Sequence, residues 1–101
     1  MLVVNRFRAS GLSLRDELET ALAVLGAQPG CEDGQVGRNV DDPTLWVRVT
    51  RWRDVGSYRR ALSSYDVKVG AVPLLGRAID EPSAYEDLDG VLNEAIPRGT
   101  T

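Results

Sequence analysis

Three side chains that can hydrogen-bond to an anionic oxygen alternate along residues 45–53. Arg48, Thr50 and Trp52 are two positions apart, so they share one face if this segment is a β-strand. The guanidinium could stabilise a phenolate or an enolate, and the indole N–H could hold an oxygen of a flat phenol. Thr50 would bind substrate beside them. One chemical use of this pattern would be to bind an oxyanion on a small aromatic molecule.

Three further side chains could complete such a site. Asn5 lies in a strand-like segment, residues 2–8, and alternation places it on the same inward face as Val3. An inward amide needs partners, so Asn5 either binds substrate or satisfies a neighbouring backbone group. Tyr58 and Tyr65 lie on the apolar side of a predicted helix. Either tyrosine could donate a hydrogen bond to substrate, or could simply be a core residue.

The two largest candidates also have purely structural interpretations. Trp52 could fill the gap between the sheet and a helix. Arg48 could form an ion pair with Glu17 or Asp66, or could extend its charged end to solvent. The sequence leaves both alternatives open.

Several other chemistries find no support in the residues. The chain has no histidine and a single cysteine, Cys31, which excludes a Cys–His nucleophile and an internal disulfide. We expect Cys31 to be a small buried residue. The acidic pairs at 41–42, 80–81 and 86–87 look like turn or surface charges, so we predict no metal site.

Length and charge narrow the class of protein. A chain of 101 residues is enough for one domain, which we place at 1–101, with a core at 2–88 and a tail at 89–101. The net charge is −3 and the basic residues are scattered, so we expect no nucleic-acid partner. We also expect no membrane segment and no signal peptide, and we expect a cytoplasmic protein.

The periodicity predicts alternating strands and helices. We expect helices to begin at Ser13 and Asp54 as N-caps, a turn at 41–44, and a short helix from Asp66 that Pro73 limits. In that short helix Val67, Ala71 and Leu74 point inward. The leucines at 14, 18, 22 and 25 form the buried stripe of the first helix, which Gly26 and then Pro29-Gly30 end. The predicted strands are residues 2–8, 31–40, 45–53 and 83–88.

This order predicts an α+β fold of the ferredoxin-like βαββαβ type, an antiparallel sheet with helices on one face. Leu45, Val47 and Val49 give the other face an apolar surface that nothing left in the chain can cover. We therefore expect a homodimer through the open sheet face, a dimeric α/β barrel.

A set of landmarks resembles the antibiotic biosynthesis monooxygenase domain, a dimeric α/β-barrel family. The resemblance covers residues 2 to about 88. It rests on four stretches in order, which are Val4-Asn5-Arg6-Phe7, Pro29-Gly30-Cys31, Asp41-Asp42-Pro43-Thr44, and Val49-Thr50-Arg51-Trp52 followed by Tyr58. The resemblance implies the barrel fold and a choice of chemistries, including cofactor-free oxidation of polycyclic phenols to quinones and degradation of haem.

The departures from the family pattern limit that choice. Asn5 matches an asparagine of the haem-degrading members, but their tryptophan falls at Ala61 and their histidine near Ala71 or Val72. Without histidine, imidazole ligation of haem is excluded. The quinone-forming members are similar at Trp52 and Tyr58 but carry asparagine where this chain has Arg48.

The sequence therefore predicts two functions from different classes. The first is a cofactor-independent monooxygenase that acts on an aromatic or polyketide-like small molecule and needs no cofactor. Its predicted catalytic residues are Asn5, Arg48, Trp52 and Tyr58, with Thr50 and Tyr65 binding substrate. The alternative is a non-catalytic dimeric module that binds a small ligand or only assembles.

Overall fold

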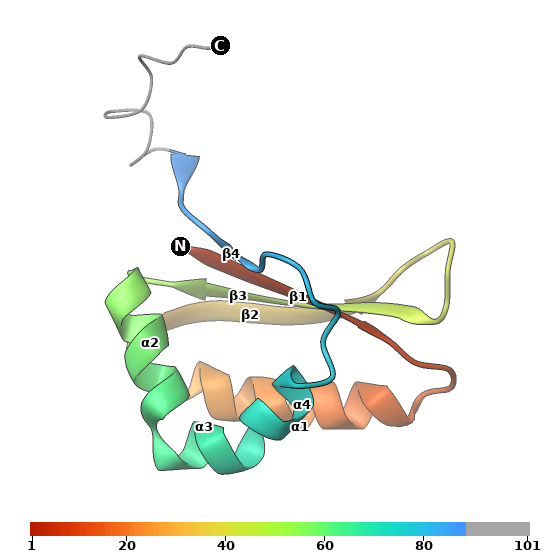
Figure 1. Ribbon diagram of the computed structural model, residues 1–101, viewed down its shortest axis with the longest axis horizontal. Coiled ribbons are helices and arrows are strands. Elements are labelled where there is room, and N and C mark those ends of the chain that lie inside the picture. Colours follow the sequence, from red (N-terminus) through yellow and green to blue (C-terminus); the bar gives the residue numbers. More distant parts are fainter. Residues whose placement is uncertain (89–101) are drawn as a thin grey trace.

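The computed structural model describes residues 1–88, in which strands and helices alternate as the sequence predicts. The predicted tail at 89–101 lies outside the described residues. In chain order the elements are β1 (Leu2–Arg8), α1 (Ser13–Gly26), β2 (Cys31–Arg38), β3 (Leu45–Trp52), α2 (Val55–Ser63), α3 (Tyr65–Gly70), α4 (Val72–Leu75) and β4 (Ala84–Tyr85) (Figure 1).

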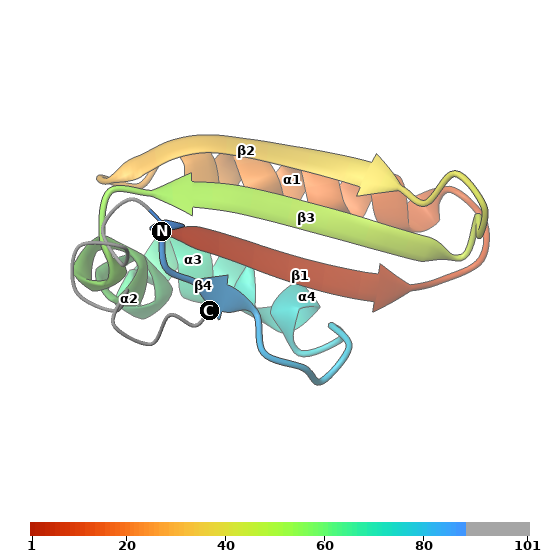
Figure 2. The same ribbon diagram turned by 90° about the horizontal axis from the view of Figure 1, so that it is seen from above.

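The sheet has the order β2-β3-β1-β4 and every neighbouring pair is antiparallel (Figure 2). All four helices lie on one face of it (Figure 1). This confirms the ferredoxin-like α+β fold. The strand ends differ from the prediction, because β2 stops at Arg38 and β4 contains only Ala84 and Tyr85.

The core lies between the sheet and the helices. The strands contribute Val3, Phe7 and Trp52, whose exposed fractions are 1% or less. From α1, Leu14, Leu18 and Leu25 are buried as predicted, whereas Leu22 is half-buried. The short helices contribute their predicted inward residues, Val67, Ala71 and Leu74.

The helix starts show one correct and one wrong expectation. Asp54 caps α2 as predicted, because its carboxylate accepts a hydrogen bond of 2.7 Å from the backbone N–H of Ser57. That bond lowers the pKa of Asp54. Ser13 is not the N-cap of α1, since the helix already includes it and Leu12 occupies the cap position without a side-chain hydrogen bond.

The predicted apolar side of the second helix is partly wrong. Ser57 and Ala61 are the buried residues of α2, while Tyr58 and Leu62 are half-buried. Tyr65 is 78% exposed. Ser64 has an extended backbone that ends α2 and caps α3, so Tyr65 belongs to a new helix and does not continue the stripe.

The second face of the sheet carries no helix of the described part of the chain. Val4 of β1 lies opposite Val49 of β3, and Val47 lies two residues from Val49 on the same face. All three valines are half-buried in the single chain. The apolar surface predicted for this face is therefore present.

Within residues 1–88, no helix combines the length and apolar character that crossing a membrane would require.

Candidate functional site

Four of the predicted site residues line one small cavity between the sheet and the helices α1 to α4. Its volume is roughly 10 Å³, which is room for about one water molecule. Its polar lining is Asn5 from β1, Arg48 and Thr50 from β3, and Tyr58 from α2. Its apolar lining is Leu25, Leu62, Val67, Ala71, Val72 and Leu75.

Strand pairing brings Asn5 and Arg48 together, because the two residues are direct partners in the β1–β3 ladder. The Nη2 of Arg48 donates to the Oδ1 of Asn5 over 3.2 Å. Asn5 is only 6% exposed, so the predicted inward direction is confirmed. Its partner is the side chain of Arg48, whereas the structural alternative expected a backbone group.

Arg48 is a buried cation, and no carboxylate of residues 1–88 pairs with it. It is 2% exposed, its guanidinium lies 5.5 Å from the ring centre of Phe7, and its Nε and Nη1 have no hydrogen-bond acceptor in the same part of the chain. Burial lowers the pKa of Arg48, since it removes water from the charge. The alternative ion pair with Glu17 is wrong, because Glu17 pairs with Arg77 at 2.8 Å.

The other two alternatives for Arg48 fail as well. Its guanidinium does not reach solvent, and Asp66 forms no ion pair with it. Asp66 instead lies in the first turn of α3 and is exposed.

Trp52 is placed as a core residue. It is 0% exposed, its ring centre lies 5.4 Å from that of Tyr58, and its Nε1–H donates to the Oγ1 of Thr50 over 2.8 Å. Trp52 does not line the cavity. Its indole N–H therefore orients Thr50, which does line it.

The two predicted tyrosines lie in different surroundings. Tyr58 is half-buried and lines the cavity. Burial raises the pKa of Tyr58, and the nearby charge of Arg48 opposes that rise. The phenol of Tyr58 therefore stays protonated at neutral pH and can donate a hydrogen bond. Tyr65 is exposed and does not line the cavity.

The apolar wall was not predicted as part of the site. Val67, Ala71 and Leu74 had been assigned inward positions, but Val72 and Leu75 had not. Val72 is 36% exposed and Leu75 is half-buried, so these lining side chains of α4 also reach solvent. A helix of four residues shows too little periodicity for sequence reasoning to find this wall.

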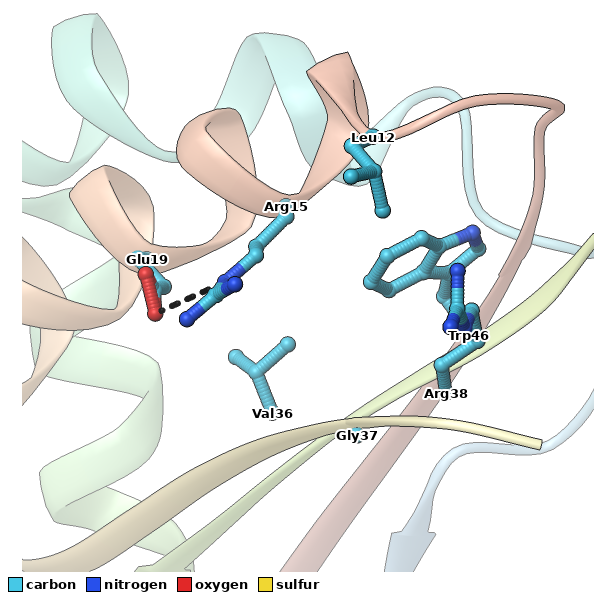
Figure 3. A pocket seen from close by; sticks show the side chains of 7 residues that line it. All are labelled: Leu12, Arg15, Glu19, Val36, Gly37, Arg38 and Trp46. Carbon is cyan, nitrogen blue, oxygen red and sulfur yellow. Dashed lines mark ion pairs between the residues drawn. The ribbon is translucent and has the colours of Figure 1, made fainter. Parts of the chain in front are cut away.

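A larger hollow of about 290 Å³ lies elsewhere, between the start of α1 and the ends of β2 and β3 (Figure 3). Arg38 lies over the ring of Trp46 there, 5.5 Å from its centre, and Arg15 faces Glu19 at 3.6 Å. None of the predicted site residues lines it. Arg15 therefore has a carboxylate partner, which Arg48 lacks among the described residues.

The described residues support neither metal binding nor chemistry at the thiol of Cys31. In the part of the chain that is described, no three His, Cys, Asp or Glu side chains are grouped to hold a metal ion. Cys31 is half-buried, whereas a fully buried position was expected. Burial raises the pKa of its thiol, which disfavours the nucleophilic thiolate.

Comparison with known proteins places this geometry in context. The family model for antibiotic biosynthesis monooxygenases matches residues 12–71, more than half of the chain. No curated protein sequence matches the chain significantly.

Solved structures share the fold. SnoaB, a cofactor-independent oxygenase from Streptomyces nogalater, is 25% identical with a TM-score of 0.68, over 86% of this chain and 94% of that one. A candidate antibiotic biosynthesis monooxygenase from Deinococcus radiodurans is 19% identical with a TM-score of 0.69, over 86% and 92%. Rv0793 from Mycobacterium tuberculosis is 20% identical with a TM-score of 0.63, over 82% and 86%. These likenesses show the shared fold, and the family-model match over more than half of the chain shows that the chain belongs to the antibiotic biosynthesis monooxygenase family.

Proposed function

We propose that this protein is a cofactor-independent monooxygenase that oxidises a small aromatic or polyketide-like molecule at the buried cavity. The observation that carries the proposal is the convergence of Asn5, Arg48, Thr50 and Tyr58 on one cavity. The likeness to SnoaB, which is a cofactor-independent oxygenase, supports the same class of reaction.

The chemistry balances without a cofactor if the substrate supplies the electrons. Converting a ring CH₂ flanked by aromatic rings to C=O releases four electrons and two protons while one oxygen atom enters. Reduction of O₂ consumes those electrons, puts one oxygen atom in the carbonyl and forms one water with the other. The polar side chains at the cavity then have two tasks, which are to orient the substrate and to stabilise the anion that reacts with oxygen.

Oxygen uptake by the pure protein with a panel of anthrone-type phenols tests this function. We expect uptake of one O₂ per product, with one ¹⁸O atom from ¹⁸O₂ in the new carbonyl. Arg59 is exposed and does not line the cavity, so Arg59→Gln should turn over like the wild type. Absence of turnover across the whole panel would contradict the proposal.

A second candidate function is non-catalytic binding of a small ligand. The size of the cavity favours it, because room for about one water is far less than an aromatic ligand needs. Ligand binding without oxygen uptake in the same samples would support this alternative.

We also propose that the protein is a homodimer through the open sheet face. Val47→Glu should weaken self-association by at least about tenfold, because the interface would then bury one additional carboxylate from each protomer. Val69 is 60% exposed on α3, on the helical side, so Val69→Glu is the matched control. Sedimentation equilibrium at micromolar concentration measures the effect. A wild-type monomer, or equal dissociation of both variants, would contradict the dimer.

A further inference from the structure

We propose that the cavity takes its substrate as an oxyanion, a phenolate or an enolate, and that Arg48 is the residue that selects the ionised form. This inference rests on the proposed function and adds the substrate class to it.

Arg48 has hydrogen-bonding capacity that the described residues do not use. Its Nε and Nη1 together carry three N–H groups, and none has an acceptor in the described structure. Buried polar groups are nearly always paired, and an unpaired buried charge is especially unfavourable. A ligand that brings negative charge would satisfy both requirements, whereas a neutral ligand would satisfy only one.

The cavity offers donors and almost no free acceptors. The Oγ1 of Thr50 accepts from Trp52, so its own hydroxyl hydrogen is left to donate. Tyr58 is protonated at neutral pH and is a second donor. The carbonyl oxygen of Asn5 is already occupied by Arg48. A lining that consists of donors and one cation matches an oxygen that accepts hydrogen bonds.

The substrate must lose its O–H proton before it can bind as an oxyanion. Arg48 and Tyr58 are the only titratable groups among the residues that line the cavity, and neither is a base at neutral pH. The substrate must therefore lose its O–H proton to water, and the charge of Arg48 favours that loss by lowering the pKa of the bound hydroxyl. This limits the substrate to phenols or enols that are acidic enough to ionise near neutral pH.

Entry of an aromatic ring requires the cavity to widen. Val72 and Leu75 of the four-residue helix α4 line the cavity and are also partly exposed to solvent. Helices as short as α3 and α4 have little stability of their own, so their displacement is the route that the structure offers.

The probe for this inference is 4-nitrophenol, which absorbs in the visible only when ionised, with 4-nitroanisole as its neutral counterpart. We expect the wild type to bind 4-nitrophenolate roughly 10- to 100-fold more tightly than 4-nitroanisole, the range for a hydrogen bond to a charged group. The ionisation of bound 4-nitrophenol should shift to lower pH. Arg48→Gln should remove the preference and the shift, while Arg48→Lys should restore part of both.

Arg59→Gln removes the same charge at an exposed site and should bind like the wild type. Circular dichroism of each variant shows whether it is folded. Equal affinity of the wild type for both probes, or binding of neither, would overturn the inference. The oxygenase proposal fails separately, because the preference for the phenolate can persist in a protein that consumes no oxygen.

Discussion

An Arg48→Met variant is expected to lose roughly 100-fold or more of the proposed oxygenase activity while becoming more resistant to unfolding. The activity should fall because a positioned donor to a developing oxyanion contributes about 100- to 1,000-fold to turnover. The free energy of unfolding should rise by about 1 kcal/mol, because an apolar side chain of similar length removes a buried cation whose N–H groups lack acceptors.

Denaturant unfolding monitored by tryptophan fluorescence measures the stability, and oxygen uptake measures the activity. The substitution also leaves the Oδ1 of Asn5 without its partner, which offsets part of the gain. An Asn5→Leu/Arg48→Met double variant removes that loss and should be at least as stable as the single variant. A fall in stability for both variants would instead mean that Arg48 serves the fold.

Strand alternation is sufficient to place several of the candidate residues on one buried face. A strand places every second residue on the same face, so Arg48, Thr50 and Trp52 were assigned together from the sequence and are all buried. Asn5 followed by the same reasoning on β1. An arginine on a buried face conflicts with the apolar pattern around it, and such conflicts are where functional residues concentrate.

The hydrogen-bond partners of these side chains could not be predicted from the sequence. The indole of Trp52 donates to Thr50 two positions away on the same strand, which depends on the rotamers that packing selects. Tyr65 was misplaced because Ser64 breaks a helical pattern that otherwise continues. The volume of the cavity depends on how closely α2, α3 and α4 pack on the sheet. The periodicity of the sequence carries no information on the distance between these helices and the sheet.

Gly30 is a second feature that the sequence showed only in part. Pro29-Gly30 was interpreted as the end of a helix, yet Gly30 has φ of +90° and a Cβ at this position would collide with the Cβ and Oγ of Ser57. Ser57 is 2% exposed, and its N–H is held by the cap residue Asp54. Gly30 therefore sets how closely α2, with the cavity residue Tyr58, approaches the start of β2.

Gly30→Ala is accordingly expected to lower the free energy of unfolding by about 3 kcal/mol, the sum of left-handed strain and overpacking against a residue that cannot move. Alanine substitutions at two other glycines separate the effect of left-handed strain from the effect of overpacking. Gly11 has φ of +78° with open space around it, so Gly11→Ala should lose only about 1–2 kcal/mol through strain. Gly26 lies in α1 with neither problem, so Gly26→Ala should be neutral or stabilising.

Denaturant unfolding of the three alanine variants tests this order. A loss for Gly30→Ala no larger than that for Gly11→Ala would contradict the close approach of Ser57. If the order holds, the folded Gly30→Ala protein should also bind 4-nitrophenolate more weakly than Gly11→Ala does, because pushing Ser57 away from β2 displaces Tyr58, the next residue along α2, from the lining that it shares with Arg48.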